Sequence, residues 1–178
     1  AAKNLVQVFL SVTTLDRPLA NIMEPRASTP AKRVAAIRAL NEAGVPCGVM
    51  AAPMIPAIND HEMEAILEAA HQAGAQRAGY TVLRLPLEIA QLFEEWLREH
   101  FPDLADRVLS LVKQMRGGKI YDSDWGQRMT GTGTLAQLIR QRFELAAKKF
   151  EFNKFRYQLD VTQFRVPESM SAKDTRQM

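Results

Sequence analysis

The chain has 178 residues, of which 47% are hydrophobic and 24% charged, and its mean hydropathy is −0.20. These values are typical of a folded globular domain and argue against a disordered chain. No apolar run approaches the roughly 20 residues of a membrane-spanning helix. The amino-terminal residues AAKNLVQVFLSV also lack the layout of a signal peptide, so we expect a cytoplasmic protein with no membrane partner.

Cysteine content and charge distribution limit the chemistry further. The single cysteine, Cys47, permits no internal disulfide and cannot supply the thiolates of an iron–sulfur cluster. Residues 1–100 hold 9 Lys and Arg against 11 Asp and Glu, whereas residues 101–178 hold 14 against 9. The second part therefore carries a charge of +5, which is compatible with nucleic acid contact. On charge alone, a solvated basic helix face is the favoured interpretation.

The first predicted elements are a strand and a helix. Residues 5–14, LVQVFLSVTT, form a β-branched and aromatic run, which is typical of an interior parallel strand buried on both faces. A loop with Pro18 and Pro25 follows. Residues 28–44 then predict a helix with Pro30 at its first position. Its capping candidates are Ser28 and Thr29, its apolar stripe is Val34, Ile37 and Leu40, and Gly44 closes it.

A second strand and helix follow in the same order. The apolar run from about residue 45 to 52 predicts a short strand, and Pro53 ends it because proline cannot donate to a ladder. Asn59 and Glu62 have the spacing of a capping box. They predict the start of a second helix, which ends at Gly74.

A third unit completes the pattern. Residues 77–83, RAGYTVL, predict a strand, and Pro86 opens a helix whose apolar face includes Phe93 and Trp96. Three such units of about 30 residues predict βαβ architecture with a parallel sheet. They amount to half of a barrel, so we expect an exposed sheet edge and an exposed apolar face.

The pattern changes after Pro102 to helices without strands. Helices are predicted over residues 104–115 and 135–150, with the glycine-rich loop 117–133 between them. The run FRYQLDVTQFRVP then alternates like a strand or an extended arm. The predicted organisation is a half barrel over residues 1–100, a helical extension over 101–167 and a mobile tail over 168–178.

Candidate functional residues follow from the position of the predicted strands. Ligands of parallel α/β folds bind at the carboxyl ends of the strands, where loops and helix amino termini converge. Hydroxyl groups there can bond sugar hydroxyls, an arginine can bind a carboxylate, and a proline-rich wall can pack on an aromatic base. The pattern favours a nucleoside joined to an amino acid. The residues in question are Ser11, Thr13, Thr14, Glu24 and Arg26, the run AAPMIPAIND, and Arg84.

These residues belong to a longer string with a family resemblance. The segments SVTTLD, MEPRAST, RVAAIRALNEAGVPCGVMAAPMIPAINDHEMEAILEAAHQAGA and YTVLRLP resemble the second half of the radical S-adenosylmethionine domain in the spore photoproduct lyase and DNA-repair-photolyase-like group. The similarity runs from residue 5 to about 145 and continues through RGGKIYDSDWGQRMTGTG. EPR after one strand and APMIP after the next are together its most specific part.

The resemblance implies a partial (β/α)6, TIM-like barrel whose first half carries a CxxxCxxC loop and a [4Fe-4S] cluster. The parent enzyme would cleave S-adenosylmethionine reductively to a 5′-deoxyadenosyl radical. No CxxxCxxC occurs in this sequence. We therefore expect the chain alone to hold no cluster and to be inactive, and we expect the missing amino-terminal half of the barrel to be its partner.

The resemblance also implies roles for particular residues. The cofactor would meet hydroxyls from the first strand, an arginine from the EPR run and backbone from the APMIP run, and the substrate would lie near the third strand. The implied cofactor residues are Ser11, Thr13, Arg26, Ala52, Pro53 and Met54, and the substrate-side residues are Tyr80 and Arg84.

Other interpretations stay open. Glu24 and Arg26 could pair with each other or cap the following helix. Cys47 suits a core position, and a phosphate site in the loop 117–133 has only weak support because the Walker spacing is missing. The whole chain could instead be a non-catalytic nucleic-acid-binding module that uses its basic second part, or a homo-oligomer joined through the exposed sheet edge.

Overall fold

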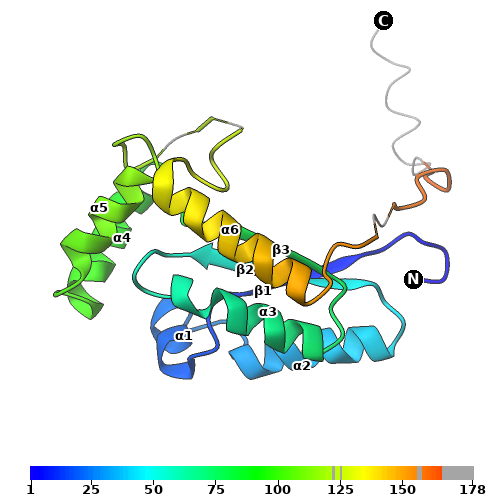
Figure 1. Cartoon of the computed structure of the whole chain (residues 1–178). Coiled ribbons are helices and arrows are strands. Elements are labelled where there is room, and N and C mark those ends of the chain that lie inside the picture. Colours follow the sequence, from blue (N-terminus) through cyan, green and yellow to red (C-terminus); the bar gives the residue numbers. More distant parts are fainter. Residues whose placement is uncertain (122, 125, 156–157, 166–178) are drawn as a thin grey trace, which may run out of the picture.

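A parallel three-stranded sheet organises the molecule (Figure 1). The computed structural model describes residues 1–121, 123–124, 126–155 and 158–165. The strands are β1 (Val8–Val12), β2 (Cys47–Met54) and β3 (Arg77–Val82), and they pair in the order β1-β2-β3. Both pairings are parallel, which confirms the predicted mixed α/β class with a parallel sheet.

A layer of three helices covers one face of the sheet. Helices α2 (Pro30–Glu42), α3 (Met63–Gln72) and α6 (Gly133–Lys149) lie side by side along it (Figure 1). α2 joins β1 to β2 and α3 joins β2 to β3, as predicted. The core between the layers is apolar, because each strand directs every second side chain toward the helices. Its fully buried members include Ile37, Val49, Ala51, Ile66, Leu67 and Ile139.

The opposite face of the sheet, called the open face below, keeps much of its surface exposed. Its side chains alternate with the buried ones, and Phe9 on β1 is 42% exposed. Phe9 lies over Gly48, since a Cβ atom built at Gly48 would be 2.5 Å from the Phe9 ring. Met50 lies over Gly79 in the same way, with 2.6 Å between its sulfur atom and a Cβ atom built there.

A second apolar core lies beyond the carboxyl ends of the strands. It involves α1 (Arg17–Met23), α4 (Ile89–His100) and α5 (Ala105–Gln114) with the segment after β2. Figure 1 shows α4 and α5 together at this end of the molecule, away from both chain termini. The buried members are Ile55, Ile58, Leu83, Leu85, Leu97, Ala105, Val108, Leu109 and Val112.

Two predictions for the first unit were wrong. β1 is an edge strand with alternating burial, not an interior strand buried on both faces. The predicted loop after it contains α1, which begins after Asp16 and has Pro18 in its first turn. The Asp16 side chain accepts a hydrogen bond of 2.9 Å from the Leu19 backbone N–H. Seven residues are too few for a helical periodicity to stand out in the sequence.

The capping box predicted at Asn59 and Glu62 was also wrong. A short 3₁₀ turn, η1 (Asp60–Glu62), precedes α3, and neither element has a side-chain cap. Both side chains instead bond to segments distant in sequence.

The later helices, α4 to α6, lie closer to the residue ranges that the sequence predicts. α4 begins at Ile89 instead of Pro86, and α5 and α6 lie close to the predicted ranges. Residues 158–165 form an arm without strand structure, tied to the amino terminus by a 2.9 Å bond from the Asp160 N–H to the Asn4 carbonyl. The tail expected from residue 168 lies outside the described residues. Within the described ranges, no helix is both long and apolar enough to cross a membrane.

Candidate functional site

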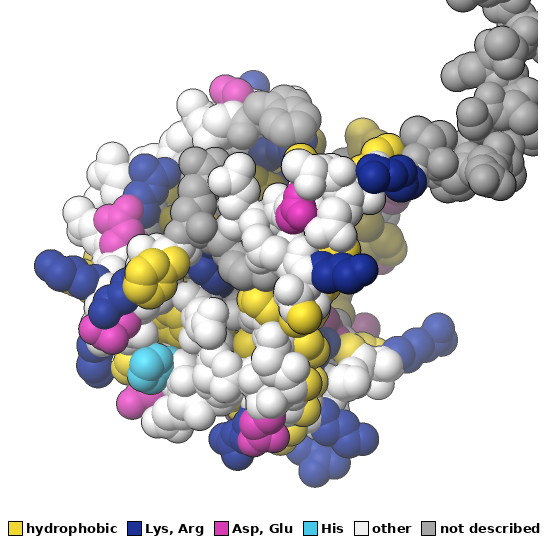
Figure 2. All heavy atoms as spheres, turned by 90° about the vertical axis from the view of Figure 1, so that its right-hand side faces the viewer, with side chains coloured by type: hydrophobic (Ala, Val, Ile, Leu, Met, Phe, Trp, Pro, Cys, Tyr) yellow, Lys and Arg dark blue, Asp and Glu magenta, His cyan; other side chains and the backbone are white. Residues whose placement is uncertain are grey.

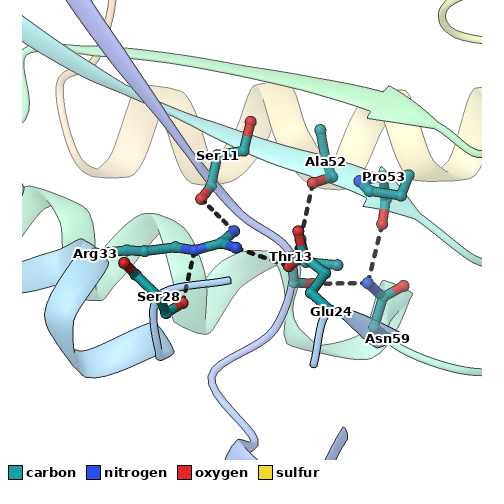
Figure 3. Close-up of polar contacts among 8 residues, drawn as sticks. All are labelled: Ser11, Thr13, Glu24, Ser28, Arg33, Ala52, Pro53 and Asn59. Carbon is teal, nitrogen blue, oxygen red and sulfur yellow. Dashed lines mark hydrogen bonds and ion pairs between the residues drawn. The ribbon is translucent and has the colours of Figure 1, made fainter. Parts of the chain in front are cut away.

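A polar cluster ties the carboxyl ends of β1 and β2 together (Figure 3). Thr13 follows β1, and its hydroxyl oxygen lies 2.8 Å from a carboxylate oxygen of Glu24 and 3.2 Å from the carbonyl oxygen of Ala52. The Thr13 residue is only 2% exposed. Its hydroxyl therefore serves the protein's own loop and is not free for a ligand.

Arg33, on the first turns of α2, holds the same loop from the other side (Figure 3). Its guanidinium group donates to the carbonyl oxygens of Ser28 and Ser11, at 3.0 and 2.9 Å, and pairs with Glu24 at 3.0 Å. Glu24 is thus paired with Arg33, whereas sequence reasoning considered only Arg26 as its partner. The sequence did contain a signal for this pair, because Arg33 lies one helical turn after Thr29, the residue that precedes α2.

Asn59 is the most buried polar side chain of the cluster, with no exposed surface. Its amide donates to the carbonyl oxygens of Thr13 and Pro53 at 2.7 and 2.9 Å and accepts from the Ile55 N–H at 2.7 Å. Three backbone groups, from the segments at the ends of β1 and β2, therefore meet at one side chain. Sequence reasoning assigned Asn59 to a helix cap, because a contact 46 residues away leaves no local pattern.

Glu62, about one helical turn after Asn59, also bonds to the loop after β1. Its carboxylate accepts from the Thr14 hydroxyl at 2.5 Å and from the Leu15 N–H at 2.7 Å. The loop after β1 is consequently fastened to the loop after β2 at several points. These contacts give the rim at the ends of β1 and β2 a defined shape.

The predicted cofactor residues divide into those whose side chains are accessible and those whose side chains are buried. Ser11, which pairs with Met50 of β2, is exposed on the open face, and Ala52 and Pro53 further along β2 are half-buried. Arg26 is exposed and makes no hydrogen bond or ion pair with any described residue. Met54, in contrast, is fully buried in the core, so only its backbone is near the rim.

An apolar groove of about 270 Å³ adjoins Pro53. No charged side chain lines it. Phe93 and Trp96 stack in its wall with ring centroids 5.6 Å apart. Both rings lie on the apolar helix face that the sequence predicts, and they pack against the second core while also bordering the groove. The lining residues are Met23, Pro53, Ile55, Leu83, Ile89, Leu92, Phe93 and Trp96.

The two predicted substrate-side residues point to different surroundings. Tyr80 faces the helix layer and contacts Phe143, with ring centroids 4.8 Å apart. Burial raises the pKa of the Tyr80 hydroxyl, and the nearby Arg140 partly opposes this rise. The Arg84 guanidinium instead lies 3.4 Å from the Tyr121 hydroxyl and 3.7 Å from the Met129 sulfur.

The basic second part of the chain is partly neutralised. Arg142 on α6 pairs with Glu64 at 2.6 Å and with Asp60 at 3.7 Å, and Lys154 pairs with Glu151. Seen from the end at which the strands begin, lysine and arginine side chains project around the perimeter with acidic ones among them (Figure 2). On this face the charges are mixed and do not form one continuous basic patch.

The described residues show no clear site for a metal ion or for a phosphate group. They contain no cluster of three or more His, Cys, Asp or Glu side chains that could hold a metal ion. Cys47 is 1% exposed, and its burial raises the pKa of the thiol. Gly131 in the loop 117–133 packs against the chain itself, since a Cβ there would be 3.0 Å from the Met115 carbonyl oxygen. The phosphate site in this loop remains a prediction.

Sequence comparison identifies relatives of unknown function. No protein-family model matches the chain, and no solved structure matches it. The chain is 33% identical over 113 residues to uncharacterized proteins of Mycobacterium bovis and Mycobacterium tuberculosis. The match covers 61% of this chain and 33% of each relative, so the chain spans about a third of the length of these curated relatives.

Proposed function

We propose that this chain is the carboxyl-terminal half of a radical S-adenosylmethionine enzyme of the spore photoproduct lyase-like group, and that it forms the cofactor-supporting side of a TIM-like barrel. One observation carries the proposal. Three parallel strands are joined by helices on a single face of the sheet, while the other face keeps Phe9 42% exposed.

A barrel explains this asymmetry. In a closed (β/α) barrel the helices form an outer ring, and side chains from other strands fill the interior. Half of such a barrel would have one covered face and one open face, as this sheet has. The relatives extend over about three times the matched length, which supports a longer parent protein.

The rim fits S-adenosylmethionine in part. The exposed hydroxyl of Ser11 could bond its ribose or its amino acid end, and the apolar groove beside Pro53 could pack on its adenine. The exposed guanidinium of Arg26, which has no partner among the described residues, could bind the carboxylate. The side chains of Thr13 and Met54 do not fit this role, because both are buried.

The chain's own contribution would be positioning. Asn59 and the pair formed by Glu24 and Arg33 would hold the rim so that Ser11 and Pro53 keep a constant separation. When bound, the cofactor and a reduced [4Fe-4S] cluster from the rest of the parent protein would supply a 5′-deoxyadenosyl radical able to abstract a substrate hydrogen. Arg84, beyond β3, is the candidate contact for the substrate.

The direct test uses the full-length parent protein. After reconstitution with iron and sulfide and reduction, it should convert S-adenosylmethionine to 5′-deoxyadenosine, detected by chromatography with mass spectrometry. The 178-residue chain treated identically is the control and should form none. A full-length protein that binds a cluster but forms no 5′-deoxyadenosine contradicts the proposal.

Ser11 can be tested in the same protein. Ser11→Ala removes one hydrogen bond to the cofactor, worth about 0.5–1.5 kcal/mol, and should weaken S-adenosylmethionine binding by about 2- to 10-fold. Titration calorimetry measures the dissociation constant. Ser28→Ala is the matched control, because Ser28 is exposed and only its backbone carbonyl contacts Arg33. Equal affinities of the Ser11 variant and the unmodified protein would remove Ser11 from the site.

A further inference from the structure

A cavity of about 540 Å³ is lined by residues of α1, of the segment after β2 and of the turn that joins α4 to α5. It has twice the volume of the groove beside Pro53 and shares no lining residue with that groove. Cavities of this size hold small molecules in many proteins, and their linings are mostly apolar with a few polar groups. Here seven of the ten lining residues are apolar, and the other three are Asp16, His61 and Glu62.

Hydrogen bonds within the chain give the lining of this cavity a fixed shape. The Ala57 N–H donates to the Asp60 carboxylate at 2.8 Å, which holds the segment after β2 in its turn. The Glu62 carboxylate accepts from the Leu15 N–H at 2.7 Å and so fixes the chain just before Asp16. A site that is formed before its ligand arrives loses less conformational entropy on binding. The cavity is therefore organised for a ligand by the fold itself.

The charges around the cavity are negative and are not balanced by a basic side chain. No lysine or arginine lines it, and neither Asp16 nor Glu62 forms an ion pair with any residue that the structure describes. One oxygen of Asp16 caps α1, and the other accepts no hydrogen bond from the described part of the chain. Glu24 and Glu64, by contrast, each pair with an arginine. A positively charged group on a ligand would supply the partner that these two carboxylates lack.

We propose that this cavity binds a small organic cation, an amine whose apolar body packs on Leu19, Phe101 and Leu104 and whose ammonium group bonds to the free oxygen of Asp16. Glu62 adds a second negative charge to the same lining. An organic cation suits the cavity better than a metal ion, because apolar side chains form most of the lining and supply no metal ligands. The site is independent of the proposed function, since it shares no residue with the groove assigned to adenine.

Titration of the 178-residue chain with phenethylamine, followed by backbone amide shifts in NMR spectra, tests the proposal. The amine should bind saturably in the low millimolar range or more tightly, as about ten non-hydrogen atoms allow. The largest shifts should fall on Ala57, Phe101 and Leu104. Phenethyl alcohol, which lacks the charge, should bind about 2- to 5-fold more weakly, and phenylacetate more weakly still because the carboxylates repel it. Equal affinities of the three probes, shifts centred on the groove beside Pro53, or no saturable binding of the amine would each overturn the proposal.

Asp16→Asn separates the charge from the fold, because asparagine caps helices as well as aspartate does. This variant should bind phenethylamine about 2- to 5-fold more weakly and bind phenethyl alcohol as the unmodified chain does. Glu42→Gln is the matched control, since Glu42 is exposed at the end of α2 and does not line the cavity. It should leave the affinity for both probes unchanged. Unchanged amine binding by Asp16→Asn, or an equal loss in the two variants, would remove Asp16 from the site and with it the proposal.

Discussion

At the scale of single residues, buried polar side chains decide the shape of the candidate site. Asn59 satisfies three backbone groups from the ends of β1 and β2, and it has no exposed surface. A buried donor or acceptor without a partner loses its hydration without compensation. The structure therefore predicts that this amide is needed for the rim, although the sequence pattern assigned its side chain to a helix cap.

Asn59→Ala should lower the free energy of unfolding by about 2–4 kcal/mol, because it leaves the Thr13 and Pro53 carbonyls and the Ile55 N–H unpaired in the interior. Urea denaturation followed by circular dichroism measures this change. Asn21→Ala is the control: Asn21 is exposed on α1 and should change stability by less than about 0.5 kcal/mol. Equal effects of the two substitutions would contradict the assigned role of Asn59.

At the scale of elements, α6 belongs with the sheet although it follows α4 and α5 in the chain. Arg142 on α6 donates two hydrogen bonds to Glu64 on α3, at 2.7 and 2.6 Å, and one to the Asp60 carbonyl. Apolar residues of α6 enter the same core as those of α2 and α3. The ion pair between Arg142 and Glu64 thus joins α6, the third helix of the layer, to α3.

The pairing makes a contribution to stability that depends on pH. Hydrogen bonds from Arg142 hold the pKa of Glu64 below its usual range in the folded protein. The stabilisation is therefore present above the usual glutamate pKa of about 4.3 and is lost as the pH falls through the lower folded value. The Glu64 side chain is 44% exposed, so solvent screening limits the contribution to about 1 kcal/mol or less.

Glu64→Gln should accordingly destabilise the protein at pH 7, and its difference from the unmodified chain should shrink toward zero below about pH 4. Urea midpoints across this pH range give the comparison. Glu68→Gln is the control, since Glu68 is exposed on the same helix without an ion pair to a described residue, and its difference should stay flat. A Glu64 difference that does not vary with pH would show that the ion pair is not its cause.

At the scale of the whole molecule, apolar surface is left uncovered on the open face and in the groove beside α4. Phe9 is 42% exposed and Leu92 is 57% exposed. Surface of this kind marks an interface or a binding groove in folded proteins. The half-barrel proposal assigns most of it to contact with the rest of the parent protein.

An apolar fluorescent dye should therefore bind the 178-residue chain and bind the full-length protein less per molecule, because the open face would be covered there. Dye fluorescence at equal molar concentration measures the difference. Phe9→Ser should reduce the signal of the short chain, while Leu145→Ser, on the outer side of α6 where Leu145 is 69% exposed, should leave the difference between the two proteins intact. Stronger binding by the full-length protein would contradict a covered face.

Hydrophobic periodicity in the sequence by itself determined the three parallel strands, most of the helix ranges and the apolar stripe at Val34, Ile37 and Leu40, because local chain geometry imposes these patterns. Only the tertiary structure decided that β1 lies at an edge, that Arg33 and Asn59 hold the rim, that Thr13 and Met54 are buried, and that the Asn153 side chain bonds to the Ala78 backbone of β3. Each of these depends on contacts between segments far apart in the chain, and such contacts leave no periodic trace in a single sequence.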